Sequence, residues 1–95
     1  METITIKPLA ELLGVNWQTV EIGTCRVPRV GGVDKEMDKR KAIEAMADYF
    51  DRKARENAKR GNASNANYLR RYRQDAVAWR KRWQRAMALL QEECI

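Results

Sequence analysis

The part of this sequence best suited to chemistry is RRYRQDAVAWRKRWQRAM, residues 70 to 87, where cations and aromatic rings are interleaved. Arg binds phosphate and carboxylate groups in a bidentate manner, whereas Lys acts as a point charge. Asp75 is the only acid between residues 68 and 91. The run predicts a surface for anions, and the alternative is a solvated helix face with excess Arg. The candidate binding residues are Arg70, Arg71, Arg73, Arg80, Lys81, Arg82 and Arg85.

The charge of the whole chain points in the same direction. The 95 residues carry a formal net charge of +6. Residues 1–33 sum to zero, residues 34–63 to +2 and residues 64–95 to +4, so the positive field increases toward the C-terminal third. A basic chain of this kind favours nucleic acid as its partner, or else an acidic surface of a host protein.

The chain lacks the residues that catalysis and metal binding commonly need. The chain has no His, which is the commonest general base and metal ligand. Its two cysteines, Cys25 and Cys94, are far apart, so we predict reduced thiols and no zinc site. Glu44 and Asp48 are spaced i,i+4, but neighbouring cations indicate a solvated face. We therefore expect no enzyme activity, no metal and no cofactor.

The N-terminal residues, METITIKPLAELLG, resemble neither a signal peptide nor a membrane-spanning segment. We therefore expect a cytoplasmic protein without a membrane partner.

A long helix over residues 64–93 must position the cation run. Its apolar side chains recur in steps of three and four residues for three heptads, which is the pattern of a coiled-coil seam. Large aromatic rings dominate small cores, so we expect Trp79 and Trp83 to lie in the core. The alternative is that one of them anchors a partner. The seam consists of Leu69, Tyr72, Ala76, Trp79, Trp83, Ala86 and Leu90.

On a helical wheel most of the cations lie nearly opposite this seam, within an arc of roughly 120°. These cations are Arg70, Arg71, Lys81, Arg82 and Arg85, whereas Arg73 and Arg80 flank the seam. The pattern predicts that rings and cations occupy different faces.

A second helix is expected over about residues 34–60, with Asp34 as its N-cap and Gly61 as its stop. Asn62 or Ser64 would cap the helix that follows. Because the turn is so short, the two helices should pack as an antiparallel helical hairpin. A homodimer that forms a four-helix bundle is a further expectation, since two helices alone make a thin core.

Residues 1–33 predict a small N-terminal α/β unit that belongs to the same domain as the hairpin, residues 34–95. TITI, residues 3–6, is typical of a short strand, and LAELLG, residues 9–14, of a short helix that stops at Gly14. Residues 16–30 are ambiguous. Apolar residues alternate around Gly23 as in a β-hairpin, and a short helix from Asn16 is the alternative.

KPLAELLGVNWQTV, residues 7–20, resembles the opening of a winged helix-turn-helix of the MerR and excisionase type, and RVPRVGG, residues 26–32, is similar to the family's strand entering the wing. The resemblance covers about a quarter of the chain. It implies transcription regulation, excision control or packaging-site recognition in a phage or mobile element. It also implies that Asn16, Trp17, Gln18 and Thr19 begin the groove-reading helix. The alternative is a small αββ platform that supports the hairpin.

The fold expected is thus mainly α, a long antiparallel helical hairpin with a small N-terminal α/β unit. The function expected is a small, basic, non-enzymatic regulator that binds nucleic acid through an Arg-rich helix face. The alternative is a phage-type inhibitor or adaptor that docks on a host protein through the hairpin.

Overall fold

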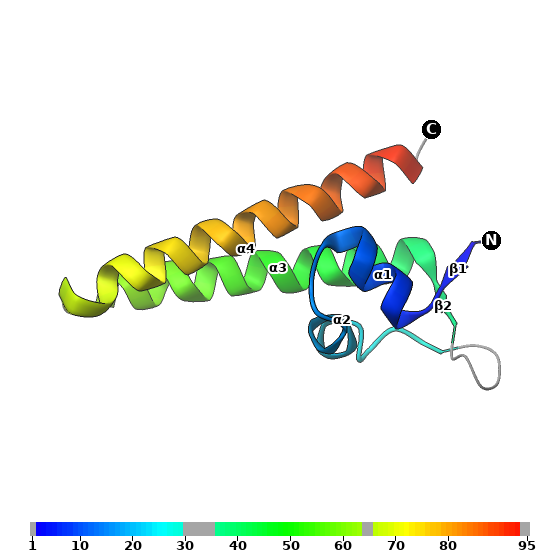
Figure 1. Ribbon diagram of the computed structural model, residues 1–95, viewed down its shortest axis with the longest axis horizontal. Helices are drawn as coiled ribbons and strands as arrows, with labels where there is room; N and C mark the ends of the chain where they lie inside the picture. Colours follow the sequence, from blue (N-terminus) through cyan, green and yellow to red (C-terminus); the bar gives the residue numbers. More distant parts are fainter. Residues whose placement is uncertain (1, 30–35, 64–65, 94–95) are drawn as a thin grey trace.

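Two long helices dominate the computed structural model of the chain, which describes residues 2–29, 36–63 and 66–93 (Figure 1). They are α3 (Lys39–Ala63) and α4 (Ala66–Glu93), and they pack as an antiparallel hairpin. The molecule extends 49 Å along its longest axis. This architecture confirms the predicted fold class. Within the described residues, no helix is both long and apolar enough to cross a bilayer.

The predicted seam of α4 does face the rest of the protein. Every seam residue is buried or half-buried. Trp79 meets Tyr49 and Phe50 of α3, with ring centroids 5.9 Å away in both cases. Phe50 is fully buried, and Trp79 and Trp83 pack against the buried cluster around it. The expectation that these two indoles belong to the core is therefore confirmed.

The N-terminal unit packs on the first half of α3 and consists of β1 (Thr3–Ile4), α1 (Ile6–Leu13) and α2 (Trp17–Gly23) (Figure 1). It also includes β2 (Met37–Asp38), which pairs antiparallel with β1. The strand predicted over 3–6 is shorter than expected, because Ile6 already begins α1. Gly14 ends α1 as predicted, with a left-handed φ of 68° that favours glycine.

The β-hairpin interpretation of residues 16–30 is wrong, and the short-helix alternative is right. Asn16 caps α2, since its Oδ1 accepts a hydrogen bond of 2.9 Å from the backbone N–H of Gln18. Val20 is fully buried under this helix. Gly23 lies so close to α3 that a Cβ there would collide with the Met46 sulfur. Burial of one face and this close approach outweigh the short alternation in the sequence.

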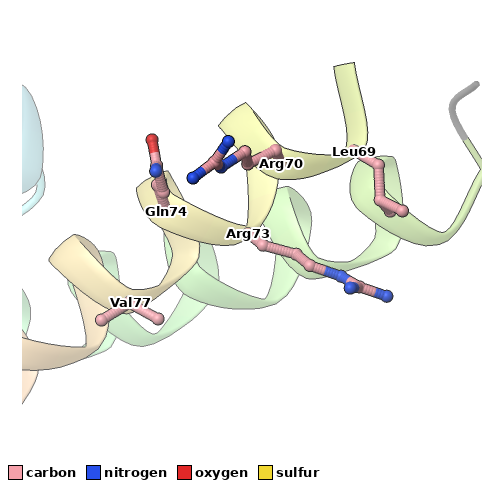
Figure 2. Close-up of a pocket in the computed structure, with 5 residues that line it drawn as sticks. All are labelled: Leu69, Arg70, Arg73, Gln74 and Val77. Carbon is pink, nitrogen blue, oxygen red and sulfur yellow. The ribbon is translucent and has the colours of Figure 1, made fainter. Parts of the chain in front are cut away.

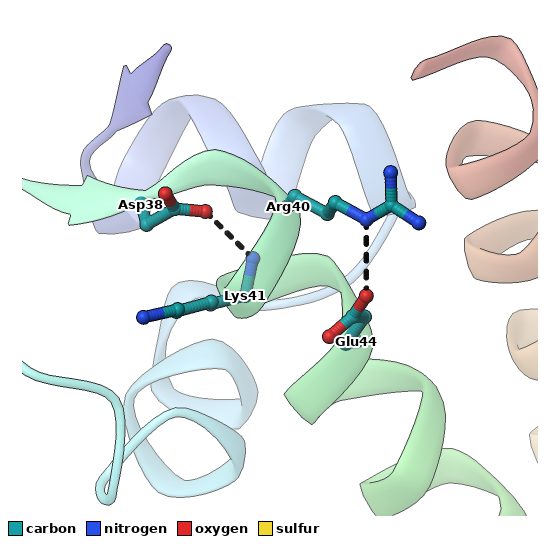
Figure 3. Close-up of polar contacts among 4 residues, drawn as sticks. All are labelled: Asp38, Arg40, Lys41 and Glu44. Carbon is teal, nitrogen blue, oxygen red and sulfur yellow. Dashed lines mark hydrogen bonds and ion pairs between the residues drawn. The ribbon is translucent and has the colours of Figure 1, made fainter. Parts of the chain in front are cut away.

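The boundaries of α3 differ from the prediction at both ends. Asp38 takes the capping role at its start, accepting a 2.9 Å hydrogen bond from the backbone N–H of Lys41 (Figure 3). The expected cap, Asp34, lies outside the described residues. At the other end, Gly61 does not stop α3, because it is buried beside Tyr72 of α4. Asn62 therefore lies within α3 instead of capping α4, and Ser64 is outside the described residues.

Candidate nucleic-acid interface

The part of α4 between Arg70 and Lys81 presents a group of cations to solvent. The packing that buries the seam leaves the opposite side of α4 open, and near the turn the hairpin has no other element beside it (Figure 1). Among the residues that the structure describes, these cations make no ion pair, although Asp75 lies four residues from Arg71. The exposed members are Arg70, Arg71, Arg73, Arg80 and Lys81.

Arg82 and Arg85, in the second half of α4, differ from the expected cation face. Arg85 is exposed, but its Nε donates a 2.7 Å hydrogen bond to the backbone carbonyl of Leu12. Leu12 belongs to the last turn of α1, where carbonyls lack partners within the helix. Arg82 is half-buried, and its guanidinium lies 4.5 Å from the centre of the Trp79 ring. Both residues therefore hold the protein together and are less available to a partner.

Rings and cations also meet more closely than the wheel indicates. Arg80 lies 5.6 Å from the centre of the Trp83 ring, three residues further along α4. Such contacts contribute roughly 0.5–1 kcal/mol at exposed sites. The prediction that rings and cations occupy separate faces is wrong at this point, because long Arg side chains reach over the edge of the seam.

The cations of α3 behave differently from those of α4. Arg40 pairs with Glu44 at 3.1 Å (Figure 3), and Arg55 pairs with Asp51 at 3.2 Å. Lys53 reaches Glu56 at 3.6 Å. These pairs span three or four residues along the helix, the spacing at which side chains of one helix meet. Three cations of α3 are thus paired with acids of the same helix, whereas the exposed cations of α4 make no ion pair with any described residue.

An uncharged patch interrupts the cations of α4. Val77 is 56% exposed and Gln74 is also exposed. Figure 2 shows these two side chains with Leu69, Arg70 and Arg73 around a hollow of about 490 Å³. A second hollow of about 330 Å³ shares Val77 and reaches α3, where Ala54 and Ala58 are too small to fill it. Val77 and Gln74 are not among the residues predicted from the sequence, although both lie among the cations on the helical wheel.

The residues named by the winged-helix resemblance divide into two groups. Trp17 and Gln18 are exposed on α2, whereas Thr19 is half-buried and the Asn16 side chain caps the helix. α2 and α4 lie on opposite sides of α3 in Figure 1. The structure therefore does not bring the candidate groove-reading residues together with the cations of α4.

Cys25 is exposed and is a free thiol; Cys94 lies outside the described residues, so the state predicted for the two cysteines stays a prediction. No group of three or more Cys, Asp or Glu among the described residues is placed to hold a metal ion.

The fold and this surface define a small helical-hairpin protein with an Arg-rich, largely unpaired helix face. No protein-family model, curated protein or solved structure matches the chain.

Proposed function

We propose that this protein is a small non-enzymatic regulator that binds nucleic acid through the exposed cations of α4 between Arg70 and Lys81. The observation that carries the proposal is the contrast between the two long helices. Among the described residues, Arg40, Lys53 and Arg55 of α3 pair with acids on the same helix, whereas the exposed cations of α4 make no ion pair. Arg is well suited to phosphate because its planar donors match the geometry of that anion.

The arrangement of the N-terminal unit gives the proposal secondary support. Its two short helices, joined by a tight turn at Gly14, follow the order that the winged-helix resemblance implies, but residues 26–29, where it implies a strand entering the wing, form no strand. However, the exposed side of α2 carries Glu21 and no cation. We therefore assign phosphate binding to α4, and a phage or mobile-element setting remains an implication of the resemblance.

Salt dependence of duplex binding tests this function directly. Four phosphate contacts give a slope of log affinity against log salt of about −3.6, which corresponds to a loss of about 150-fold between 50 and 200 mM salt. We expect this behaviour in fluorescence anisotropy with a labelled 20-base-pair duplex. Absence of binding at 50 mM salt would overturn the proposal.

A second candidate function is docking on a host protein through the hairpin. Tyr68 favours it, because it is a large side chain of α4 that is 54% exposed. Such residues are common at protein interfaces. A pull-down from bacterial lysate after nuclease treatment separates the two candidates. A stoichiometric protein partner that is lost with Tyr68→Glu would replace the first candidate by the second.

A further inference from the structure

Four of the exposed cations of α4 form two pairs separated by a gap, whereas Arg71 lies on another side of the helix. Arg70 and Arg73 make the first pair, and Arg80 and Lys81 make the second. The midpoints of the pairs are about nine residues apart, or roughly 13 Å along the axis of an α-helix. All four positions fall within about 100° of the helical wheel, so both pairs face the same side.

The gap between the pairs is uncharged and open. Gln74 and Val77 are the exposed side chains that point outward there, beside the hollow of about 490 Å³ drawn in Figure 2. On the α3 side, Ala54 and Ala58 leave a shallow trough next to Arg80 and Lys81. The surface therefore has cations at its two ends, with uncharged side chains and shallow hollows between them.

We propose that α4 crosses the major groove of duplex DNA, with one cation pair on each phosphate strand. The roughly 13 Å between the pairs matches the major groove, which is about 12 Å wide, and exceeds the minor groove, which is about 6 Å wide. Gln74 and Val77 then face the base edges, where Gln can contact adenine and an apolar group can contact the thymine methyl. This inference rests on the proposed function and names its ligand as B-form DNA.

Other nucleic acids fit this surface less well. Proteins that bind single strands stack bases on aromatic side chains. In the described part of α4, the indoles near the cation pairs, Trp79 and Trp83, are half-buried in the seam. Duplex RNA has a deep, narrow major groove that side chains cannot read. The surface thus favours duplex DNA over both.

The first experiment compares three labelled probes of one sequence by anisotropy: duplex DNA, duplex RNA and single-stranded DNA. We expect duplex DNA to bind at least about 10-fold more tightly than the other two, because it alone presents a wide major groove. Equal binding of all three overturns the major-groove inference but leaves the proposed function intact. No binding of any probe at 50 mM salt overturns both.

The second experiment removes each cation pair in turn. Arg70→Gln/Arg73→Gln and Arg80→Gln/Lys81→Gln should each reduce the magnitude of the salt slope by about 2, since each variant loses two phosphate contacts. Arg52→Gln/Arg55→Gln on α3 removes the same charge from exposed positions outside the surface and should leave the slope unchanged. A loss confined to one pair, or an equal loss in the α3 control, contradicts placement on two strands.

The third experiment blocks the groove itself. A duplex whose cytosines carry glucosylated hydroxymethyl groups has bulky substituents in the major groove and the same phosphates. We expect it to bind at least about 10-fold more weakly, and Val77→Glu to weaken binding of the unmodified duplex similarly. Circular dichroism checks that Val77→Glu folds, as its exposure predicts. Unchanged affinity for the modified duplex overturns the inference.

Discussion

Arg85 and Lys81 offer a matched test of which cations stabilise the fold and which stay free for a partner. Both are exposed, both lie on α4 one turn apart, and substitution by Gln removes one charge in each case. Gln has nearly the same helix propensity as Arg and Lys, so helix formation itself is unaffected. Arg85 differs because its Nε donates a 2.7 Å hydrogen bond to the carbonyl of Leu12 in the last turn of α1.

The expected cost of Arg85→Gln follows from this contact. A hydrogen bond from a charged donor contributes about 1.5–3 kcal/mol, and a cation near an exposed helix C-terminus contributes about 0.3–1 kcal/mol. Because solvent screens Arg85, we take about 1 kcal/mol, which lowers the melting temperature of a domain of this size by about 4–8 °C. Lys81→Gln should change the free energy of unfolding by less than about 0.5 kcal/mol.

Urea unfolding followed by circular dichroism measures the stability of both variants, and anisotropy against salt measures their DNA binding. We expect each variant to lose one of the two properties, stability or DNA binding, and to keep the other. Arg85→Gln should lose stability and keep the salt slope, whereas Lys81→Gln should keep stability and reduce the slope by about 1. Equal urea midpoints for the two variants would refute the Arg85–Leu12 contact. An equal reduction of the slope would refute the division of the cations.

Four further predictions concern the core and assembly. Phe50→Ala should lower the free energy of unfolding by about 3–5 kcal/mol, measured by urea unfolding with Trp fluorescence, because the ring is fully buried against Tyr49 and Trp79. In the same assay, Gly23→Ala should cost about 1–3 kcal/mol by overpacking against Met46, whereas Gly61→Ala should add about 0.5–1 kcal/mol, since its Cβ meets ordinary contacts inside α3. Sedimentation at micromolar concentration should show a homodimer, and a single species at the chain's own mass of 11.1 kDa would contradict it.

The hairpin could be predicted from the sequence because its signal is long and regular. Three heptads of apolar side chains on α4 leave one choice of buried face, and the structure buries that face. The end of α1 could also be predicted, since Gly14 adopts the left-handed conformation that favours glycine. Local rules of helix formation are sufficient for such features.

Features that depend on distant contacts could not be predicted in this way. β2 forms because Met37 and Asp38 pair with Ile4 and Thr3, more than thirty residues earlier in the chain. Gly61 stays helical because burial beside Tyr72 compensates for its poor helix propensity. These outcomes are set by tertiary packing, which a single segment does not encode.

Distant contacts also decide which cations of α4 are available to a partner. A helical wheel treats all cations opposite the seam alike, but α1 approaches only the second half of α4, where Arg85 meets Leu12 and Ala86 is fully buried. The part of α4 from Arg70 to Lys81, beyond the reach of the N-terminal unit, keeps its cations in solvent. The surface available to a partner is therefore shorter than the Arg-rich run itself. α2 lies on the opposite side of α3 from α4 in Figure 1, so we assign no part of this surface to α2.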